Sequence, residues 1–383
     1  MISLFTYPGW ACETVALAGA GYAMLASALA ARFRRREQAP LAAAPAVTIL
    51  KPLHGAEPDL SRNLETFFTQ DYPAPVQIVF GVSDRNDPAL AVVRALEAKY
   101  PHRDTAIVAD PARHGANAKV SNLINMMAGA RHDVLVLSDS DISVRPDWLR
   151  QVTAALAQPG VGVVTCLYTG EPAQDGRQPW SSLAAMGTSY DFLPNAMVGV
   201  SLGLATPCFG STIALTRRTL EEAGGFAAFA DQLADDYEMG RAVRARGHAL
   251  AIPPLGVGHT AAETRLMDLV RHELRWARTI RMVDPAGHLG SFVTHTFAFA
   301  LIGAALLHFN AVSLAALAVA LGTRLFLKFR IDGIFGTHAG PFWLLPVRDL
   351  LSFAVFVASL FGERVHWRGS DFAVEPSGAM SRI

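Results

Sequence analysis

Apolar residues are gathered at the two ends of this chain, and this distribution constrains the fold more than any other feature of the sequence. Residues 10–31 carry one charge, Glu13, and four arginines follow between Arg32 and Arg36. At a rise of about 1.5 Å per residue, one helix of this length would span a bilayer core of roughly 30 Å. A cleaved signal peptide would carry its charges before the apolar run. Because flanking basic residues stay in the cytoplasm, the sequence predicts an uncleaved anchor that leads into a cytoplasmic segment.

The second apolar region lies towards the C-terminus. Residues 291–323 carry no charge, and as one helix of about 50 Å they would be too long for a single span. We therefore expect two spans with a break at residues 308–310. A third stretch, residues 342–362, has Arg348 and Asp349 near its middle, and charges at that depth must face protein or water. We interpret it as a re-entrant or interfacial helix, with an ordinary span as the alternative.

The residues between these ends have a different pattern. Short β-rich runs alternate with helical stretches, which is typical of a mostly parallel sheet covered by helices. Strands are expected at residues 47–50, 76–82, 105–109 and 134–137, and helices at 60–69, 88–99 and 237–246. The sequence thus predicts an α/β fold with transmembrane helices at both ends. We divide it into an anchor with a basic linker (1–45), a central domain (46–288) and a C-terminal membrane region with a cytosolic tail (289–383).

The composition excludes several classes of protein. The chain has 33 basic and 33 acidic residues and is 51% hydrophobic, so it is neither disordered nor a nucleic-acid-coating protein, and no nucleic-acid partner is expected. Its three cysteines are Cys12, Cys166 and Cys208, and none forms a Cys-x-x-Cys pair. Neither a disulfide framework nor a cysteine zinc site is therefore expected.

Acidic residues follow two of the expected strands. Asp139 and Asp141 come just after the run at 134–137, and Asp84 follows the run at 76–82. In open α/β sheets, ligands bind beyond the carboxyl ends of the strands. Two carboxylates there suit Mg²⁺ or Mn²⁺ completed by diphosphate oxygens, and a solvated turn is the alternative. Asp84 is a candidate acceptor for a base or ribose hydroxyl, or it belongs to a turn that caps the next helix.

Two later groups of residues add to the case for catalysis. Asp235 and Asp236 open an expected helix, where capping accounts for one acid and leaves the other as a candidate general base. Arg275 and Trp276 lie in a helical stretch with further arginines. An arginine face is often only solvated surface, but beside a diphosphate it would be an anion clamp, and the indole would offer a flat wall to a sugar or a lipid headgroup.

Eight motifs, taken in chain order, carry a family resemblance. They are LKPLHG at 50–55, NLETFF at 63–68, QDYP at 70–73, DRNDP at 84–88, KVSNL at 119–123, DSD at 139–141, DDY at 235–237 and RW at 275–276. Over nearly its whole length the sequence resembles the ceramide glucosyltransferase family, glycosyltransferase family 21, and within it the hopanoid-biosynthesis branch. The resemblance implies a GT-A fold with a Rossmann-like mixed sheet and inverting transfer from a UDP-sugar. It also implies a need for Mg²⁺ or Mn²⁺.

The resemblance also implies roles for individual residues. By position, these are donor binding at Asp84, Lys119 and Asp139, metal binding at Asp139 and Asp141, and catalysis at Asp235, Asp236, Arg275 and Trp276, with Asp236 as the base. His272 departs from the family pattern, which usually has Gln or Arg three residues before the Arg-Trp pair, so ceramide recognition is not simply carried over. By likeness to the hopanoid branch, the acceptor would be a polyol such as bacteriohopanetetrol and the donor UDP-N-acetylglucosamine.

Location and partners follow from the same resemblance. It implies a multi-pass protein of the bacterial inner membrane, with a cytosolic catalytic domain, a UDP-sugar donor and a lipid acceptor. Residues 365–369 look like a tail motif that the family keeps near the cytosolic site, so one late apolar stretch should not cross the membrane completely. Three alternatives stay open: a ceramide or diacylglycerol glucosyltransferase that uses UDP-glucose, a processive polysaccharide synthase, and a non-catalytic membrane scaffold with a decayed transferase domain.

Overall fold

A computed structural model of the chain describes residues 6–38, 40–41, 43–174 and 179–362, together with the backbone of three short strands after them. The helices are α1 (Thr6–Arg34), α2 (Leu60–Phe68), α3 (Ala89–Lys99), α4 (Ala118–Met126), α5 (Trp148–Leu156), α6 (Pro179–Gly187), α7 (Leu193–Ser201), α8 (Arg217–Glu222), α9 (Asp235–Ala245), α10 (Leu266–Val283), α11 (Pro285–Gly290), α12 (Thr296–Leu306), α13 (Ala311–Phe335) and α14 (Leu345–Ser359), with a π-helix η1 (Thr188–Phe192) and 3₁₀-helices η2 (Phe226–Phe229), η3 (Ser291–Thr294) and η4 (Phe342–Leu344). The strands are β1 (Val47–Pro52), β2 (Val76–Val82), β3 (Asp104–Ala109), β4 (Val134–Leu137), β5 (Ile142–Ser143), β6 (Val161–Thr165), β7 (Leu167–Pro172), β8 (Ile213–Thr216), β9 (Ala249–Ala251), β10 (Gly256–Ala261), β11 (Arg364–Trp367), β12 (Ser370–Val374) and β13 (Met380–Arg382).

A mixed sheet of seven strands, in the order β3-β2-β1-β4-β8-β6-β9, forms the centre of the α/β body. Strand β1 pairs in parallel with β2 and β4, whereas β8 runs antiparallel to β4 and β6. Every residue of β1 and β4 is buried, as expected for strands covered by helices on both faces. Successive side chains of β4 belong to two different parts of the core: Val136 lies in the same buried cluster as Phe80, and Leu135 lies in the same buried cluster as Leu123. These findings confirm the predicted α/β fold.

A second sheet of three strands, β5-β10-β7, positions the end of β10. Strand β10 pairs antiparallel with β5, which directly follows the acidic segment after β4, and parallel with β7. In this register, His259 lies opposite Ile142. The second sheet therefore brings β10 beside the segment that carries Asp139 and Asp141.

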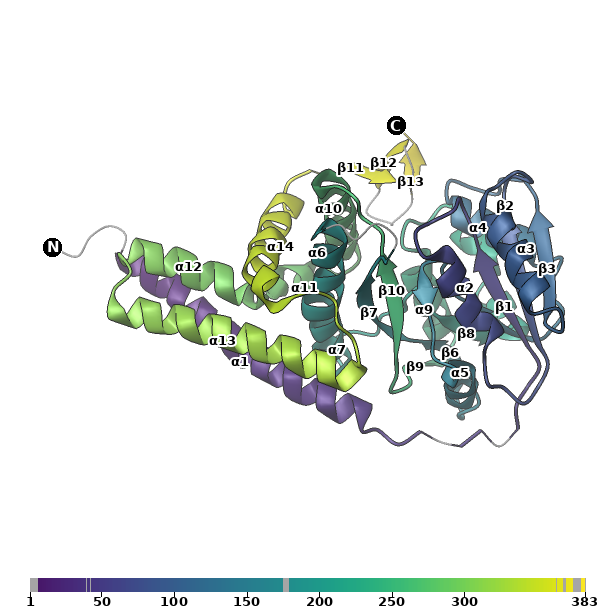
Figure 1. Cartoon of the computed structure of the whole chain (residues 1–383), viewed down its shortest axis with the longest axis horizontal. Coiled ribbons are helices and arrows are strands. Elements are labelled where there is room, and N and C mark those ends of the chain that lie inside the picture. The colour runs from purple at the N-terminus through teal and green to yellow at the C-terminus, as the bar shows by residue number, and fades with distance from the viewer. Residues whose placement is uncertain are drawn as a thin grey trace.

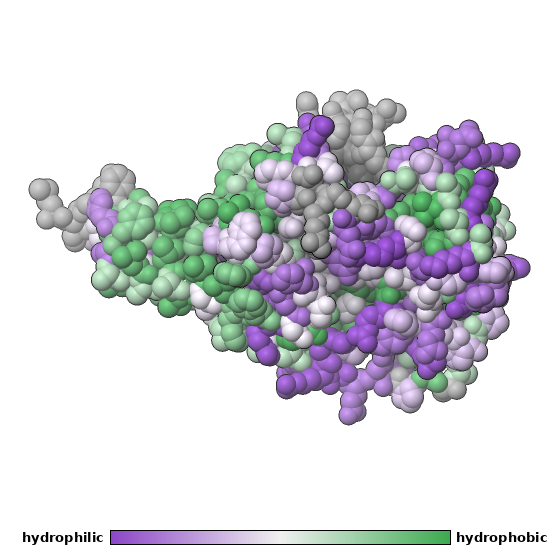
Figure 2. Space-filling model, viewed as in Figure 1, coloured by the Kyte–Doolittle hydropathy of each residue, from purple (hydrophilic) through white to green (hydrophobic). Residues whose placement is uncertain are grey.

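Helices α1, α12 and α13 form an apolar bundle that projects from the α/β body (Figure 1), and the surface of this bundle is hydrophobic (Figure 2). Helix α1 spans 29 residues and includes the whole of the expected anchor. The predicted break at residues 308–310 is also confirmed. His308 and Phe309 adopt positive φ, and Asn310 caps α13 by accepting a hydrogen bond from the Ser313 amide at 2.9 Å.

The first of the two spans expected in the C-terminal region, before the break at residues 308–310, is shorter than predicted. Helix α12 has 11 residues, about 16 Å, which is shorter than a hydrocarbon core of roughly 30 Å. The helical segment before it, Pro285–Thr294, is bent by 57° from Thr296–Leu306. By length and composition, three helices in the described part of the chain could cross a membrane: Thr6–Arg34, Ala311–Phe335 and Phe342–Ser359. The bent pair would be a fourth only as a broken span.

Helix α14 lies across the bundle instead of along it (Figure 1). The side chains of Arg348 and Asp349 are buried in protein, as the sequence predicts for charges in an apolar stretch. The orientation of α14 favours the interfacial interpretation of residues 342–362, which remains a proposal. Of the tail motif at residues 365–369, Arg368 and Gly369 lie outside the described residues, and only the backbone of β11 is described.

Candidate active site

The acidic segment after β4 is held at the carboxyl edge of the central sheet. The Asp139 amide donates to the carbonyl of Gly210 at 3.3 Å. Beneath it, the buried ammonium of Lys51 donates to Ser138 Oγ at 3.4 Å and to the Asp139 carbonyl oxygen. The side chains of Asp139 and Asp141 keep 33% and 37% of their surface exposed. The segment is thus fixed through its backbone, while both carboxylates can still meet a ligand.

Lys119 links these acids to the acids of α9. It lies in the first turn of α4, whose N-cap residue Asn117 accepts hydrogen bonds from the Lys119 and Val120 amides. The Lys119 ammonium lies 2.6 Å from Asp139 Oδ1 and 3.7 Å from Asp235 Oδ2. Burial alone would lower the pKa of Lys119, but the surrounding carboxylates, led by Asp139 and Asp235, raise it above its ordinary value. The ammonium therefore stays charged and binds three segments together.

The two acids that open α9 have different surroundings. Asp235 is buried and accepts a hydrogen bond from Asn117 Nδ2 at 3.2 Å. Asp236 accepts hydrogen bonds from the amides of Gly210 and Tyr237, each at 2.8 Å. Burial, and then the charge of Asp235, raises the pKa of Asp236 to about 6. Such a carboxylate is ionised at neutral pH and is basic enough to take a hydroxyl proton.

Gly210 is the point where these acid-bearing segments meet. Its amide donates to Asp236, and its carbonyl accepts from the amide of Asp139. A Cβ at this position would lie 2.5 Å from Asp139 Oδ2 and 3.0 Å from Lys119 Nζ. The loop between α7 and β8 can approach the acids this closely only because residue 210 has no side chain.

His259 is a site residue that the sequence analysis missed. It lies on β10, is 8% exposed, and its Nε2 is 3.3 Å from Asp141 Oδ2. Burial opposes the ionisation of Asp141, but the charge and hydrogen bond of His259, together with the charges of Lys51 and Lys119, outweigh it and lower the pKa of Asp141 to about 2. In the sequence His259 is an isolated histidine in a β-rich run. Only the register between β10 and β5 reveals its partner.

Trp276 lies in a cluster of rings that begins at His259. The ring centroid of Trp276 is 5.7 Å from that of His259, 6.5 Å from that of Tyr168 and 6.4 Å from that of Phe192. Burial and the nearby carboxylates raise the pKa of Tyr168 well above its ordinary value, whereas the charge of Arg275 opposes the rise. Trp276 therefore lies beside His259, the histidine that contacts Asp141, and the charge of Arg275 acts on Tyr168.

His272, the departure from the family pattern, belongs to the same cluster. Its ring lies edge-on to Trp276 at 4.5 Å, and its Nδ1 is paired with Glu263. Glu263 follows β10, is 9% exposed, and keeps Oε2 buried without a hydrogen-bond partner in the part of the chain that the structure describes. Glu263 could not be recognised as a site residue from the sequence, because its pairing with His272 joins the end of a strand to a helix.

Asp84 stays apart from the other acids. It follows β2, which is separated from β4 by β1 in the sheet. Its side chain is exposed and accepts a hydrogen bond from the Asn86 amide at 2.9 Å, which forms a local turn. Asp84 and the acids after β4 thus lie along the same edge of the sheet. The role of Asp84 in donor binding remains a prediction.

The donor set suits a hard divalent cation. Among the described residues, no group of three or more Asp, Glu, His or Cys side chains converges in a way that could hold a metal. Asp141, however, keeps Oδ1 buried with no hydrogen-bond partner in the part of the chain that the structure describes, and Asp139 lies two residues before it. Mg²⁺ is commonly bound by one or two carboxylates, with the remaining positions taken by water and substrate phosphates. Asp139 and Asp141 fit that kind of site.

A match to a known family agrees with this geometry. The model described as glycosyl transferase family 21 matches residues 11–380. The chain belongs to glycosyltransferase family 21. It is 29% identical to "Ceramide glucosyltransferase 1" of Caenorhabditis elegans over 61% of this chain and 49% of that protein. It is 34% identical to the ceramide glucosyltransferase of Candida albicans over 29% of this chain and 22% of that protein. The matched part spans about half, or less, of the length of these family 21 relatives.

A solved structure supports the fold assignment. The mannosyltransferase from Pyrobaculum calidifontis, in complex with GDP-Man and Mn²⁺, aligns with 91% of this chain and 99% of its own. The TM-score is 0.55 and the identity is 21%. At this identity the likeness shows the fold alone, which confirms the GT-A fold implied by the sequence resemblance.

Proposed function

We propose that this family 21 protein transfers a sugar from a UDP-sugar to a hydroxyl group of a membrane lipid, with inversion at the anomeric carbon. One observation carries the proposal: the acids around Lys119 and the ring of Trp276 lie together on an α/β body that is joined to an apolar helical bundle. A lipid acceptor needs this combination, because its hydroxyl must meet a polar donor while its chain stays in the membrane.

In the proposed reaction, the lipid hydroxyl attacks the anomeric carbon, the bond from that carbon to UDP breaks, and UDP leaves with the electron pair. Asp236 accepts the hydroxyl proton, and its raised pKa, about 6, makes it a suitable base at neutral pH. Lys119 and Arg275 bring positive charge towards the departing diphosphate. Trp276 and Tyr168 give the sugar or the lipid headgroup an aromatic wall.

A divalent cation, Mg²⁺ or Mn²⁺, would stabilise the charge that develops on the diphosphate. Asp139 and Asp141 would hold it. His259 would orient Asp141 through the 3.3 Å contact between them, as outer-shell partners commonly orient metal-binding carboxylates. Asp84 would contact the nucleoside end of the donor, at the edge of the sheet beyond β1.

For the substrates, we propose UDP-N-acetylglucosamine as donor and a hopanoid polyol such as bacteriohopanetetrol as acceptor, in the bacterial inner membrane with the α/β body in the cytosol. The resemblance to the hopanoid branch supports this choice, and so does His272 at a position where the family usually has Gln or Arg. The second candidate is transfer of glucose from UDP-glucose to ceramide, which the names of the curated relatives favour.

The proposal is tested with purified full-length protein, Mg²⁺ or Mn²⁺, and a panel of UDP-sugars and lipids that includes bacteriohopanetetrol, ceramide and diacylglycerol. Mass spectrometry of the lipid extract identifies the product. A lipid carrying one sugar supports the proposal, and the mass identifies both substrates. A ladder of products with increasing numbers of sugars would instead indicate a processive synthase. Absence of both glycolipid and released UDP would favour the scaffold alternative and overturn the proposal.

A further inference from the structure

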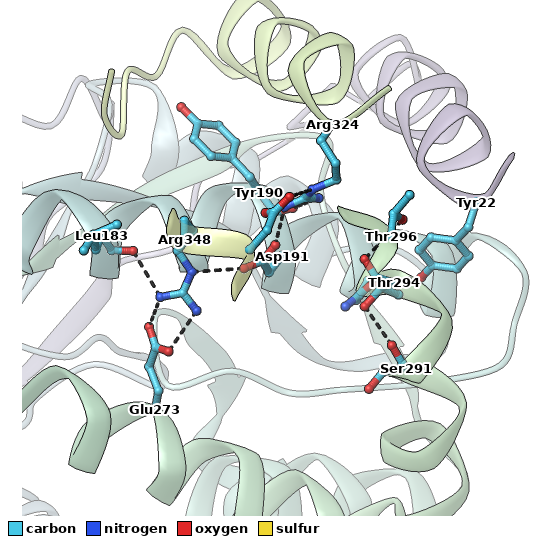
Figure 3. A network of polar contacts seen from close by, with 12 residues as sticks. Tyr22, Leu183, Tyr190, Asp191, Glu273, Ser291, Thr294, Thr296, Arg324 and Arg348 are labelled. Carbon is cyan, nitrogen blue, oxygen red and sulfur yellow. Dashed lines mark hydrogen bonds and ion pairs between the residues drawn. The ribbon is translucent and has the colours of Figure 1, made fainter. Parts of the chain in front are cut away.

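Arg348 reaches from α14 to two elements that carry rings of the aromatic cluster. Its Nε donates to Asp191 Oδ2 at 3.2 Å, and its Nη2 donates to Glu273 Oε2 at 2.8 Å. Its Nη1 donates to the other oxygen of Glu273 and, at 3.3 Å, to the carbonyl of Leu183. Figure 3 shows the guanidinium between these three partners. A single side chain of the C-terminal region therefore joins η1, α6 and α10.

Both acidic partners of Arg348 are close in sequence to a ring of the cluster. Asp191 directly precedes Phe192 in the π-helix η1, and Glu273 lies three residues before Trp276, on a neighbouring position of the same face of α10. The rings of Phe192 and Trp276 are 6.4 Å apart. One guanidinium thus sets how the two ring-bearing elements lie relative to each other. A π-turn inside a helical region is itself frequent at functional sites.

Arg324, from α13, fixes the other side of this arrangement. Its Nη2 lies 2.5 Å from Asp191 Oδ1 and 2.7 Å from Asp349 Oδ1, and its Nε donates to Asp349 Oδ2 at 2.9 Å. Its Nη1 donates to the Tyr190 carbonyl at 2.9 Å. Every guanidinium nitrogen of Arg324 and Arg348 therefore has a partner. The result is a rigid link from the bundle to η1, visible in Figure 3.

Helix α10 depends on such polar contacts for its position. Leu269 is its one buried residue, so apolar packing alone constrains it weakly. The fit around Arg348 is also close, since a Cβ on Gly187 would lie 2.9 Å from Arg348 Cζ. Because a bidentate arginine-carboxylate pair fixes geometry as well as charge, the pair between Arg348 and Glu273 is suited to set the angle at which α10 presents Trp276.

We propose that Arg348 is a positioning residue for the lipid acceptor: it holds Phe192 and Trp276 at the separation that the acceptor requires. Transfer to lipid then depends on a helix of the C-terminal apolar region, whereas donor binding, which lies around Asp139 and Lys119, does not. This inference rests on the proposed function, since it assumes that the ring cluster meets the acceptor.

The test uses the Arg348→Lys variant of the full-length protein. This substitution keeps the positive charge and removes the bidentate contact with Glu273. With the lipid that the wild-type protein accepts, we expect the KM for lipid to rise by about tenfold, because small displacements of a positioning group are costly. UDP affinity, and release of UDP in the absence of lipid, should stay within about twofold of wild type. In a Trp276→Phe background, Arg348→Lys should add little, since coupled residues are not additive.

A matched control distinguishes the positioning of Phe192 and Trp276 from a simple attachment of α10 to the end of α14. Arg281, also on α10, donates to the carbonyls of Leu360 and Gly362, each at 2.7 Å, beyond the end of α14. Arg281→Lys should leave the KM for lipid unchanged. If Arg348→Lys cannot be purified, Glu273→Gln takes its place with the same expected pattern.

Several outcomes would overturn the inference. They are an equal loss of lipid transfer and lipid-independent UDP release, an equal effect of Arg281→Lys, or full additivity with Trp276→Phe. Wild-type protein that transfers sugar to no lipid of the panel would overturn both the proposed function and this inference. Normal wild-type transfer with an unchanged KM in Arg348→Lys would overturn the positioning role alone.

Discussion

Two clusters of buried charge in the described part of the chain differ in how completely their polar atoms are paired. The cluster at the junction with the bundle, around Arg324 and Arg348, gives every guanidinium nitrogen a partner. The cluster at the sheet edge is incomplete. Among the described residues, Asp141 Oδ1, Asp235 Oδ2 and His259 Nδ1 are buried without a hydrogen-bond partner.

This difference indicates that the charges at the junction have a structural role and that the charges at the sheet edge have a chemical role. A buried polar group without a partner is costly, and a site that binds ligands accepts this cost because the ligand supplies the missing partner. The acids at the sheet edge also have shifted pKa values, raised for Asp236 and lowered for Asp141, as is common at functional sites. The paired junction is instead suited to holding elements in one arrangement.

The largest expected effect is at the sheet edge. Asp236→Asn should lower sugar transfer by about 10³-fold, because it removes the proposed base and keeps the size of the side chain. UDP binding, measured by calorimetry, should stay close to wild type, since Lys119 and Asp139 are unchanged. Residual transfer within about tenfold of wild type would exclude Asp236 as the base.

Substitutions in the two clusters should change the free energy of unfolding in opposite directions. Arg348→Met leaves Asp191 and Glu273 without their shared partner and should cost about 3–5 kcal/mol. Asp236→Asn should instead stabilise the fold by about 1–2 kcal/mol at pH 7, because a raised pKa means that the native state disfavours the charge. Thermal unfolding of both variants in the same detergent measures the contrast. Destabilisation of similar size in both would remove the distinction between the clusters.

The sequence predicted the features that depend on neighbouring residues. The run at 134–137 and the acids after it follow from local pattern, and so does the break at 308–310, where Asn310 caps the next helix. Contacts between distant segments could not be read in this way. Arg348 and Asp191 are 157 residues apart, and His259 meets Asp141 only through the register of β10 with β5. For the buried charges, the sequence indicated that partners must exist but not which residues they are.

The pH dependence of transfer provides a smaller, directional test. Protonation removes the proposed base, so transfer should fall as the pH drops through about 6, the raised pKa of Asp236. The charge of Asp235 is the second cause of that rise, after burial. Asp235→Asn should therefore lower the pKa of Asp236 and move the acid limb of kcat/KM to lower pH. The control is Asp133→Asn, which changes an exposed acid directly before β4 and should leave the limb in place.

The smallest expected effect concerns His272, which lies at the ring cluster between the two regions. Within the described ranges, its partner Glu263 keeps one buried oxygen without a hydrogen bond, so this pair resembles the incomplete cluster more than the junction. His272→Gln restores a residue that is usual in the family, and it should change the ratio of kcat/KM between hopanoid polyol and ceramide by about three- to tenfold. UDP release without lipid should be unaffected. Competition assays with both lipids measure the ratio. If the ratio of kcat/KM between the two lipids is unchanged, the contact of His272 with Trp276 does not affect which lipid is accepted. His272 would then have a structural role, like the paired charges at the junction.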